Sequence, residues 1–169
     1  TTDTQLDPGV EVVSSWDKEN SNFIELNGDS IKFNGVGASV NKNIISISKS
    51  GTYVISGKLN DGQIIVEESS KGTVHLVFNG AEINNSSSSP VFIKKAGMVV
   101  ITLEKGTENI VTDGKDYIFA DSNETEPDAA IFSKDDLYIN GEGTLIVNAN
   151  YNDGIKSKDN LEIISGNIT

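Results

Sequence analysis

A ten-residue phrase occurs twice in this chain, and its spacing constrains the fold more than any other feature. Residues 128–137 read DAAIFSKDDL and residues 152–161 read NDGIKSKDNL, so five of the ten positions are identical at an offset of 24 residues. Short β-branched segments bounded by Gly, Asn, Asp or Ser surround the phrase, and no stretch shows convincing helical periodicity. The pattern indicates similar units, built from short strands, that stack on one another.

From residue 64 onward the predicted strands fall into four groups of three. The groups begin at Ile64, Val91, Ile131 and Ile155, which are 27, 40 and 24 residues apart. The widest interval contains an acidic insertion at about 116–127, and without it the period is about 24 to 28 residues. Three short strands in such a period predict the coils of a parallel β-helix, in which each coil must stack on its neighbours to bury its few inward side chains.

Alternation along the strands predicts which side chains face the core. In the third and fourth groups the inward positions are Ile131, Leu137, Ile139, Ile155, Leu161 and Ile163, and the outward ones are Phe132, Tyr138, Lys156 and Glu162. A β-sandwich also has short strands and frequent turns, but it does not explain identical residues at a fixed offset. The expected fold is therefore an all-β, parallel β-helix solenoid.

The beginning of the chain fits the period poorly. Residues 1–60 are expected to form an irregular β N-terminal cap with entry strands, which covers the open end of the coils over residues 61–169 in one domain. The sequence stops at Thr169 in the middle of a predicted strand, directly after a well-formed repeat. Further coils, another copy in a homo-oligomer, or a second chain are therefore expected to continue the stack.

Composition excludes several classes of function. The net charge of −12 disfavours nucleic acid as a partner and suits a divalent cation. The absence of Cys excludes disulfides and thiolate metal centres, and all 13 basic residues are Lys. No apolar run approaches the roughly 18 residues of a membrane span, and the opening TTDTQLDPG is not a signal peptide. Export is therefore compatible with the sequence without being shown by it.

Stacking would gather acidic and amide side chains of the repeated phrase at two turns. Equivalent positions on successive coils lie about 4.8 Å apart, and carboxylates at that spacing repel one another. Calcium would remove the repulsion, because it takes 6 to 8 oxygen ligands from carboxylates, amides and carbonyls. The predicted metal ligands are Asp128, Asp135, Asp136, Asn152, Asp153 and Asp159. The alternative is that these are solvated turn residues.

Outward side chains on the first strand of each group predict an apolar strip. Its members are Ile65, Phe92, Phe132 and Lys156. Apolar strips of this length are usually covered or used. Either the insertion covers the strip with residues 117–119, or the strip is a platform for flat sugar rings. The candidate carbohydrate-binding residues are Tyr138, Tyr151, Phe132 and Lys156.

Signals for catalysis are scarce. The single His, His75, lies in a strand pattern, and neither a G-x-S-x-G motif nor a phosphate-binding glycine loop is present. A carboxylate pair for glycoside hydrolysis cannot be chosen among 25 acidic residues. The residues therefore do not predict an active site, and no catalytic residue is assigned.

The segments AIFSKDDLYINGEG and DGIKSKDNLEIISG, after GTYVISG at 51–57, resemble a known family. It comprises secreted clostridial carbohydrate-binding proteins that form a right-handed parallel β-helix like that of polysaccharide lyases. The resemblance implies calcium as a cofactor, plant cell-wall polysaccharide (cellulose or acidic pectic sugars) as the partner, and an extracellular or cell-surface location in a bacterium.

The same resemblance raises the question of lyase activity. Lyases of this fold typically use Arg or Lys as the base that abstracts a proton next to a uronate. This chain has no Arg, and its net charge would raise the pKa of a lysine base away from neutrality. We therefore expect non-catalytic binding. A calcium-dependent pectate lyase and a structural or adhesive surface module remain the alternatives.

Overall fold

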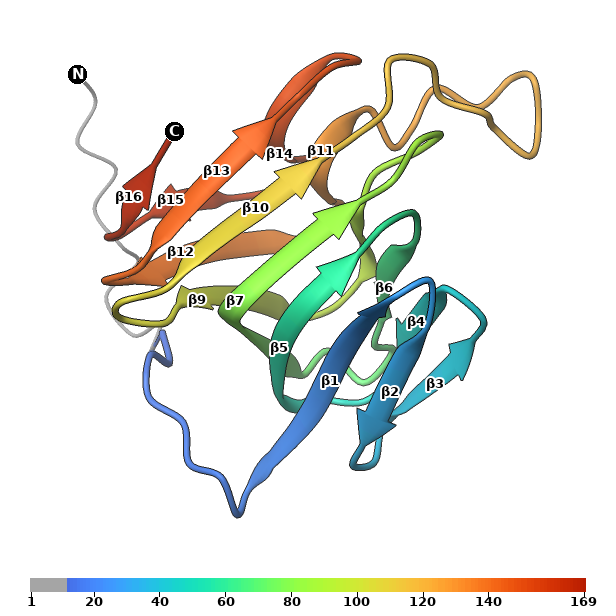
Figure 1. The fold of residues 1–169 in the computed structure, drawn as a ribbon. Coiled ribbons are helices and arrows are strands. Elements are labelled where there is room, and N and C mark those ends of the chain that lie inside the picture. Colours follow the sequence, from blue (N-terminus) through green and yellow to red (C-terminus); the bar gives the residue numbers. More distant parts are fainter. Residues whose placement is uncertain (1–11) are drawn as a thin grey trace, which may run out of the picture.

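The computed structural model describes residues 12–169, and every helix or strand in that range is a β-strand (Figure 1). The larger sheet contains β1 (Ser21–Gly28), β2 (Ile31–Asn34), β5 (Gly51–Leu59), β7 (Thr73–Asn84), β9 (Met98–Leu103), β10 (Glu108–Thr112), β12 (Asp136–Gly141), β13 (Thr144–Asn148), β15 (Leu161–Ile163) and β16 (Asn167–Ile168). The smaller sheet contains β3 (Ala38–Asn41), β4 (Ile44–Ile47), β6 (Gln63–Glu67), β8 (Val91–Lys95), β11 (Ala129–Ser133) and β14 (Asp153–Ser157). Within residues 12–169 no helix is long and apolar enough to cross a membrane.

Both sheets are mostly parallel, and their registers follow the repeat. In the smaller sheet Ile64 pairs with Val91, Val91 with Ile131, and Ile131 with Ile155. Strands of successive groups therefore pair in the register that the spacing of the groups predicted, and this prediction is confirmed. β7 serves as both the second and the third strand of its group, because its first half pairs with β9 and its second half with β10. Figure 1 shows β5, β7, β10 and β13 side by side.

Inward side chains from the two sheets form one continuous apolar core. The predicted inward residues of the third group, Ile131, Leu137 and Ile139, are fully buried in it. Ile155 packs against the same core from β14. Leu161 and Ile163 differ, since 41% and 51% of their surfaces are exposed. They lie on β15, which is the last strand of its sheet, so no neighbouring strand covers them.

The opposite end of the sheets is built differently. β1 and β2 form an antiparallel pair, as do β3 and β4, while β1 also continues the parallel sheet by pairing with β5. Antiparallel hairpins at this end cover strand edges that a parallel stack leaves open. Residues 1–11 of the expected cap lie outside the described residues.

A short segment before β1 runs across the outward face of the larger sheet. The Asn140 side-chain amide donates a hydrogen bond to the Val13 carbonyl oxygen (2.8 Å). The Trp16 indole N–H donates to the Glu104 carboxylate (2.8 Å), and the Trp16 ring meets the edge of Phe23 at a centroid distance of 6.3 Å. These contacts join the N-terminal segment to β12, to the turn after β9 and to β1.

Candidate functional site

The insertion between β10 and β11 projects from the sheets at the upper right of Figure 1. Its base is held by Tyr117, which stacks on Tyr151 at a centroid distance of 4.1 Å and donates its hydroxyl hydrogen to the Asp113 carboxylate (2.6 Å). The Ile118 N–H donates to the Ser87 carbonyl oxygen (2.9 Å). Burial, with a further contribution from Asp113, raises the pKa of Tyr117, so this hydroxyl remains protonated. These contacts fix where the insertion leaves the sheet.

The predicted outward strip is present on the smaller sheet. Ile65 pairs with Phe92, Phe92 with Phe132, and Phe132 with Lys156. The two phenyl rings meet edge to face at 5.7 Å, and only 9% of Phe92 and none of Phe132 is exposed. The Nζ atom of Lys94 lies 5.6 Å from the centre of the Phe92 ring, which places an ammonium over this part of the strip.

A hollow of about 550 Å³ separates the strip from the insertion. Its floor contains Phe92, Lys94 and Lys134, and the insertion supplies Asn123, Glu124 and Glu126 to the opposite wall. Residues of the insertion thus line the same hollow as Phe92, of which only 9% is exposed. Ammonium, carboxylate and amide groups around a phenyl ring provide both hydrogen-bond donors and acceptors, which is the chemistry that sugar hydroxyls require.

The first acidic turn contains three of the predicted metal ligands. The Asn152 side-chain amide donates to Asp128 Oδ2 (3.2 Å), as the stacking predicted. Lys156 Nζ donates to both Asp128 oxygens (3.0 and 2.9 Å) and lies 4.0 Å from Asp153 Oδ2. The hydrogen bonding that Lys156 donates to Asp128 raises the pKa of Lys156. Lys156 is therefore a persistent cation here and is unsuited to act as a base at neutral pH.

The second acidic turn is only partly as predicted. Asp136 Oδ1 accepts from the backbone and side-chain N–H groups of Asn160 (3.1 and 3.0 Å). The Asp135 carboxylate instead accepts from the Ala96 N–H (2.9 Å) of the preceding repeat, and Asp159 is exposed. In the described part of the chain no three Asp, Glu or His side chains gather where they could hold a metal ion. Donor groups already bond the carboxylates of Asp128, Asp135 and Asp136, and calcium at these two turns stays a prediction.

The four candidate carbohydrate-binding residues differ in accessibility. Phe132 is fully buried and Tyr138 is 5% exposed, so neither presents a ring face to a ligand. Tyr151 is 41% exposed, with one face covered by Tyr117, and Lys156 is engaged by Asp128. Sequence reasoning did not select Lys94, although it stands two positions after Phe92 as Lys134 does after Phe132. Alternation along β8 places Lys94 on the same face as the Phe92 ring, and Lys134 directly follows the end of β11.

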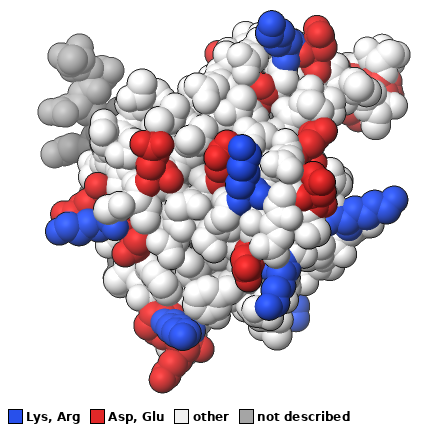
Figure 2. All heavy atoms as spheres, viewed as in Figure 1, with Lys and Arg blue, Asp and Glu red and all other residues white. Residues whose placement is uncertain are grey.

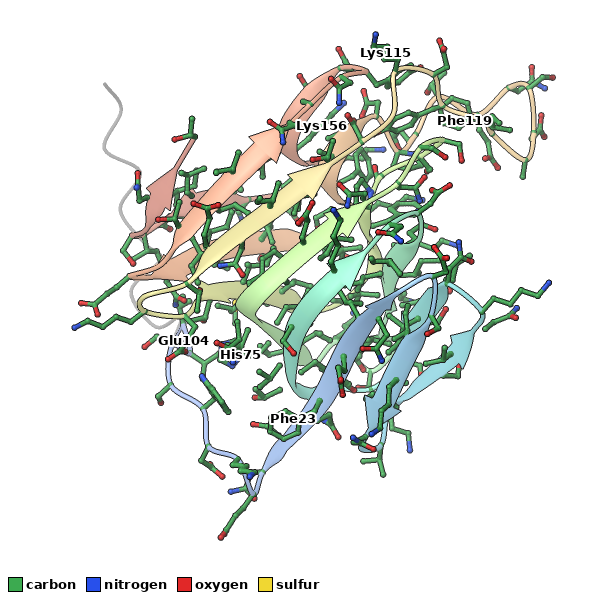
Figure 3. All side chains as sticks on the ribbon, in the orientation of Figure 1. Phe23, His75, Glu104, Lys115, Phe119 and Lys156 are labelled. Atoms are coloured by element: carbon green, nitrogen blue, oxygen red, sulfur yellow. The ribbon has the colours of Figure 1, made fainter. Side chains whose placement is uncertain are left out.

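His75 lies in β7, as its strand pattern predicted, and takes no part in this site. It is 2% exposed, and its Nε2 lies 2.7 Å from Thr102 Oγ1. Burial lowers its pKa to about 4. Figure 3 shows His75 and Glu104 well apart from Lys156 and Phe119 at the insertion end. The imidazole therefore has a structural role in the larger sheet.

Charge on the visible surface is mixed. Figure 2 shows that most basic side chains on this face lie beside acidic ones. Ion pairs in the structure include Lys158–Glu126 at 3.0 Å and Lys58–Glu82 at 3.4 Å. Two lysines and two glutamates line the hollow, so it is polar without a strong excess of either charge.

A parallel all-β fold with a polar, ring-floored hollow is a suitable scaffold for binding a glycan. The family model described as "Carbohydrate-binding domain-containing protein" matches residues 41–169, from the end of β3 through β16. The chain therefore belongs to the carbohydrate-binding domain-containing protein family.

Two individual proteins are similar over most of the chain. A carbohydrate-binding domain-containing protein of Acetivibrio thermocellus is 39% identical over 163 residues, which cover 96% of this chain and 53% of that protein. A solved structure of the polysaccharide lyase-like protein from C. thermocellum, a gadolinium derivative, has a TM-score of 0.85 and 40% sequence identity. That match covers 88% of this chain and 60% of the other. The chain thus spans about half the length of the curated relative.

Proposed function

We propose that this protein binds plant cell-wall polysaccharide without cleaving it, in the hollow between the insertion and the outward face of β8 and β11. The observation that supports the proposal is the lining of that hollow, where Phe92, Lys94 and Lys134 face Asn123 and Glu124 across about 550 Å³. Membership of a carbohydrate-binding family supports the ligand class. We include in this proposal an extracellular or cell-surface location.

The chemistry of the lining suits a polyol. Carboxylates accept hydrogen bonds from sugar hydroxyls, ammonium groups donate to them, and the exposed part of Phe92 offers an apolar contact. Glu126 is paired with Lys158 at 3.0 Å, which reduces the negative charge on the insertion side. Neutral cellulose and acidic pectic chains are both within the proposed range, with Lys94 and Lys134 as the groups that meet a carboxylate.

Binding is favoured over lyase chemistry by the state of the available bases. A base that removes a proton next to a uronate needs a pKa near the working pH. The pKa of Lys156 is raised by its hydrogen bond with Asp128, and His75 is buried in a different part of the larger sheet. Ultraviolet absorbance of an unsaturated product on pectate with calcium would detect lyase activity, and a flat trace across alkaline pH is expected.

We further propose that the stacked groups form a right-handed parallel β-helix. The parallel in-register ladders support this architecture, as does the 0.85 TM-score with the polysaccharide lyase-like protein. β14, β15 and β16 are the terminal strands of their sheets and carry exposed Leu161 and Ile163. A further coil or a second copy packed on this edge would cover them, and light scattering distinguishes a monomer from a homo-oligomer.

The binding proposal is tested with insoluble cellulose pull-down and affinity electrophoresis in polygalacturonate. Wild-type protein should be retained by at least one of the two glycans. The K94Q/K134Q double variant should lose most of that retention, whereas K18Q/K32Q, which removes two exposed lysines of the N-terminal region, should not. Failure of the wild type on both glycans would refute the function. Equal retention of the two double variants would refute the location.

A further inference from the structure

The first acidic turn brings two carboxylates to one place. Asp128 stands just before β11 and Asp153 begins β14, at equivalent turns of successive repeats. Only 17% of the Asp128 side chain is exposed. Two negative charges this close, one of them largely removed from water, would destabilise the stack without a cation between them.

The chain supplies that cation itself. Lys156 Nζ donates to Asp128 Oδ1 and Oδ2 at 3.0 and 2.9 Å and lies 4.0 Å from Asp153 Oδ2. The Asn152 amide adds a hydrogen bond to Asp128 Oδ2 at 3.2 Å. Both carboxylate oxygens of Asp128 therefore receive donors from side chains of β14 and the turn before it. A charge-assisted pair in which one ammonium meets both oxygens is stronger than a neutral hydrogen bond.

The position of Lys156 is set by packing as well as by charge. It continues the outward column of the smaller sheet directly beside Phe132, with Nζ 5.9 Å from the ring centre. Phe132 is fully buried, and only 34% of the Lys156 side chain is exposed. The aliphatic part of the lysine is thus restrained along a buried ring, and this lowers the entropic cost of placing its ammonium at Asp128.

We propose that the Lys156 ammonium is the resident cation of this turn and occupies the place that the sequence assigned to calcium. Calcium at Asp128 would need 6 to 8 oxygen ligands, and it would have to displace an ammonium that already contacts both carboxylate oxygens. The turn is therefore stable without a divalent metal. This inference is independent of glycan binding at the hollow.

The test compares thermal melting in calcium and in chelator for wild type, K156Q, K156R and D128N. Wild type should melt at the same temperature in both buffers. K156Q should melt lower in chelator and be raised by calcium, because Asp128, Asp153 and the Asn152 amide then lack a cation. K156R retains a cation and should behave like wild type. Calorimetric titration of calcium into wild type and D128N should show no Asp128-dependent uptake.

Three results would overturn the proposal. The first is calcium uptake by wild type that D128N abolishes, since a metal would then be the resident cation. The second is a K156Q protein that melts like wild type in chelator, since the ammonium would then be dispensable. The third is an equal response of wild type and K156Q to calcium. If K156Q does not fold, the D128N/K156Q variant removes both charges and should recover folding, and its failure to do so counts against the proposal.

Discussion

Acidification should destabilise this protein through one identifiable side chain, His75. Thr102 donates its hydroxyl hydrogen to Asn140 Oδ1 (2.6 Å), so the His75 Nε2–H must donate to Thr102 Oγ1 (2.7 Å). The Nδ1 atom is left as an acceptor, 3.4 Å from Thr52 Oγ1. The Asn140 amide completes the chain of hydrogen bonds at the Val13 carbonyl oxygen. Adding a proton to Nδ1 places a charge in a site that is 2% exposed.

The size of the loss in unfolding free energy follows from the pKa shift of His75. Burial lowers the pKa of His75 from 6.5 to about 4. The unfolded chain therefore binds the proton more readily, so the stabilisation is complete above pH 6.5 and is lost as the pH falls toward 4. A shift of this size is worth about 3 kcal/mol, most of which is lost by pH 4.5. Because ordinary Asp and Glu pKa values of about 3.9 and 4.3 lie at the acid end of this window, the contribution of His75 has to be separated with a variant that lacks the imidazole.

The assay is urea unfolding between pH 4.5 and 8, followed by fluorescence of the single Trp, Trp16. Wild type should lose about 2–3 kcal/mol of unfolding free energy across the window. H75Q, which hydrogen-bonds but does not titrate, is the matched control and should show a nearly flat profile. Because the chain has one His, its imidazole NMR signal can be followed directly and should titrate near pH 4.

Two results would refute this reasoning. An imidazole that titrates near its ordinary value of 6.5 would show that burial does not disfavour the charged form. Parallel pH profiles for wild type and H75Q would show that another group governs the acid sensitivity.

Two further predictions each compare a pair of substitutions, and chemical denaturation measures the stability of each variant. L137A removes a fully buried side chain and should cost about 2–5 kcal/mol, whereas L161A, at the 41% exposed partner position, should cost less than half as much. Equal costs would contradict the assignment of β15 as an open edge. G57A should be severely destabilising, because its Cβ would lie 2.2 Å from the Leu26 carbonyl oxygen at a φ of +89°. G80A has a φ of +75° in open space and should cost only about 1–2 kcal/mol. A G57A protein as stable as G80A would show that the backbone of β1 moves aside.

The all-β class and the strand registers could be predicted, because parallel stacking requires the same kind of inward residue at the same place in each repeat. Ile64, Val91, Ile131 and Ile155 could therefore be aligned by spacing alone, and the strand registers follow that alignment. The same alternation predicted the outward strip and the pairing of Asp128 with Asn152. These features depend on local periodicity, which a linear sequence records directly.

The second acidic turn and the hollow could not be predicted, because they depend on the conformations of long side chains and of the insertion. Asp135 and Asp159 occupy equivalent positions, yet the Asp135 carboxylate turns to the Ala96 N–H and away from Asp159. The hollow brings residues of the insertion and of β8 to one place, which no spacing in the sequence states.

By itself, the sequence determined the repeat, the strand registers that follow from it and the inward residues of the third group, because these follow from spacing and alternation along the chain. Only the tertiary structure decided which group neutralises the first acidic turn. Lys156 reads in the sequence as an outward residue of a strand. Its ammonium bonds Asp128, 28 residues earlier in the chain, from a position beside Phe132 on the neighbouring strand. A contact that depends on side-chain direction in three dimensions has no counterpart in the period of the sequence.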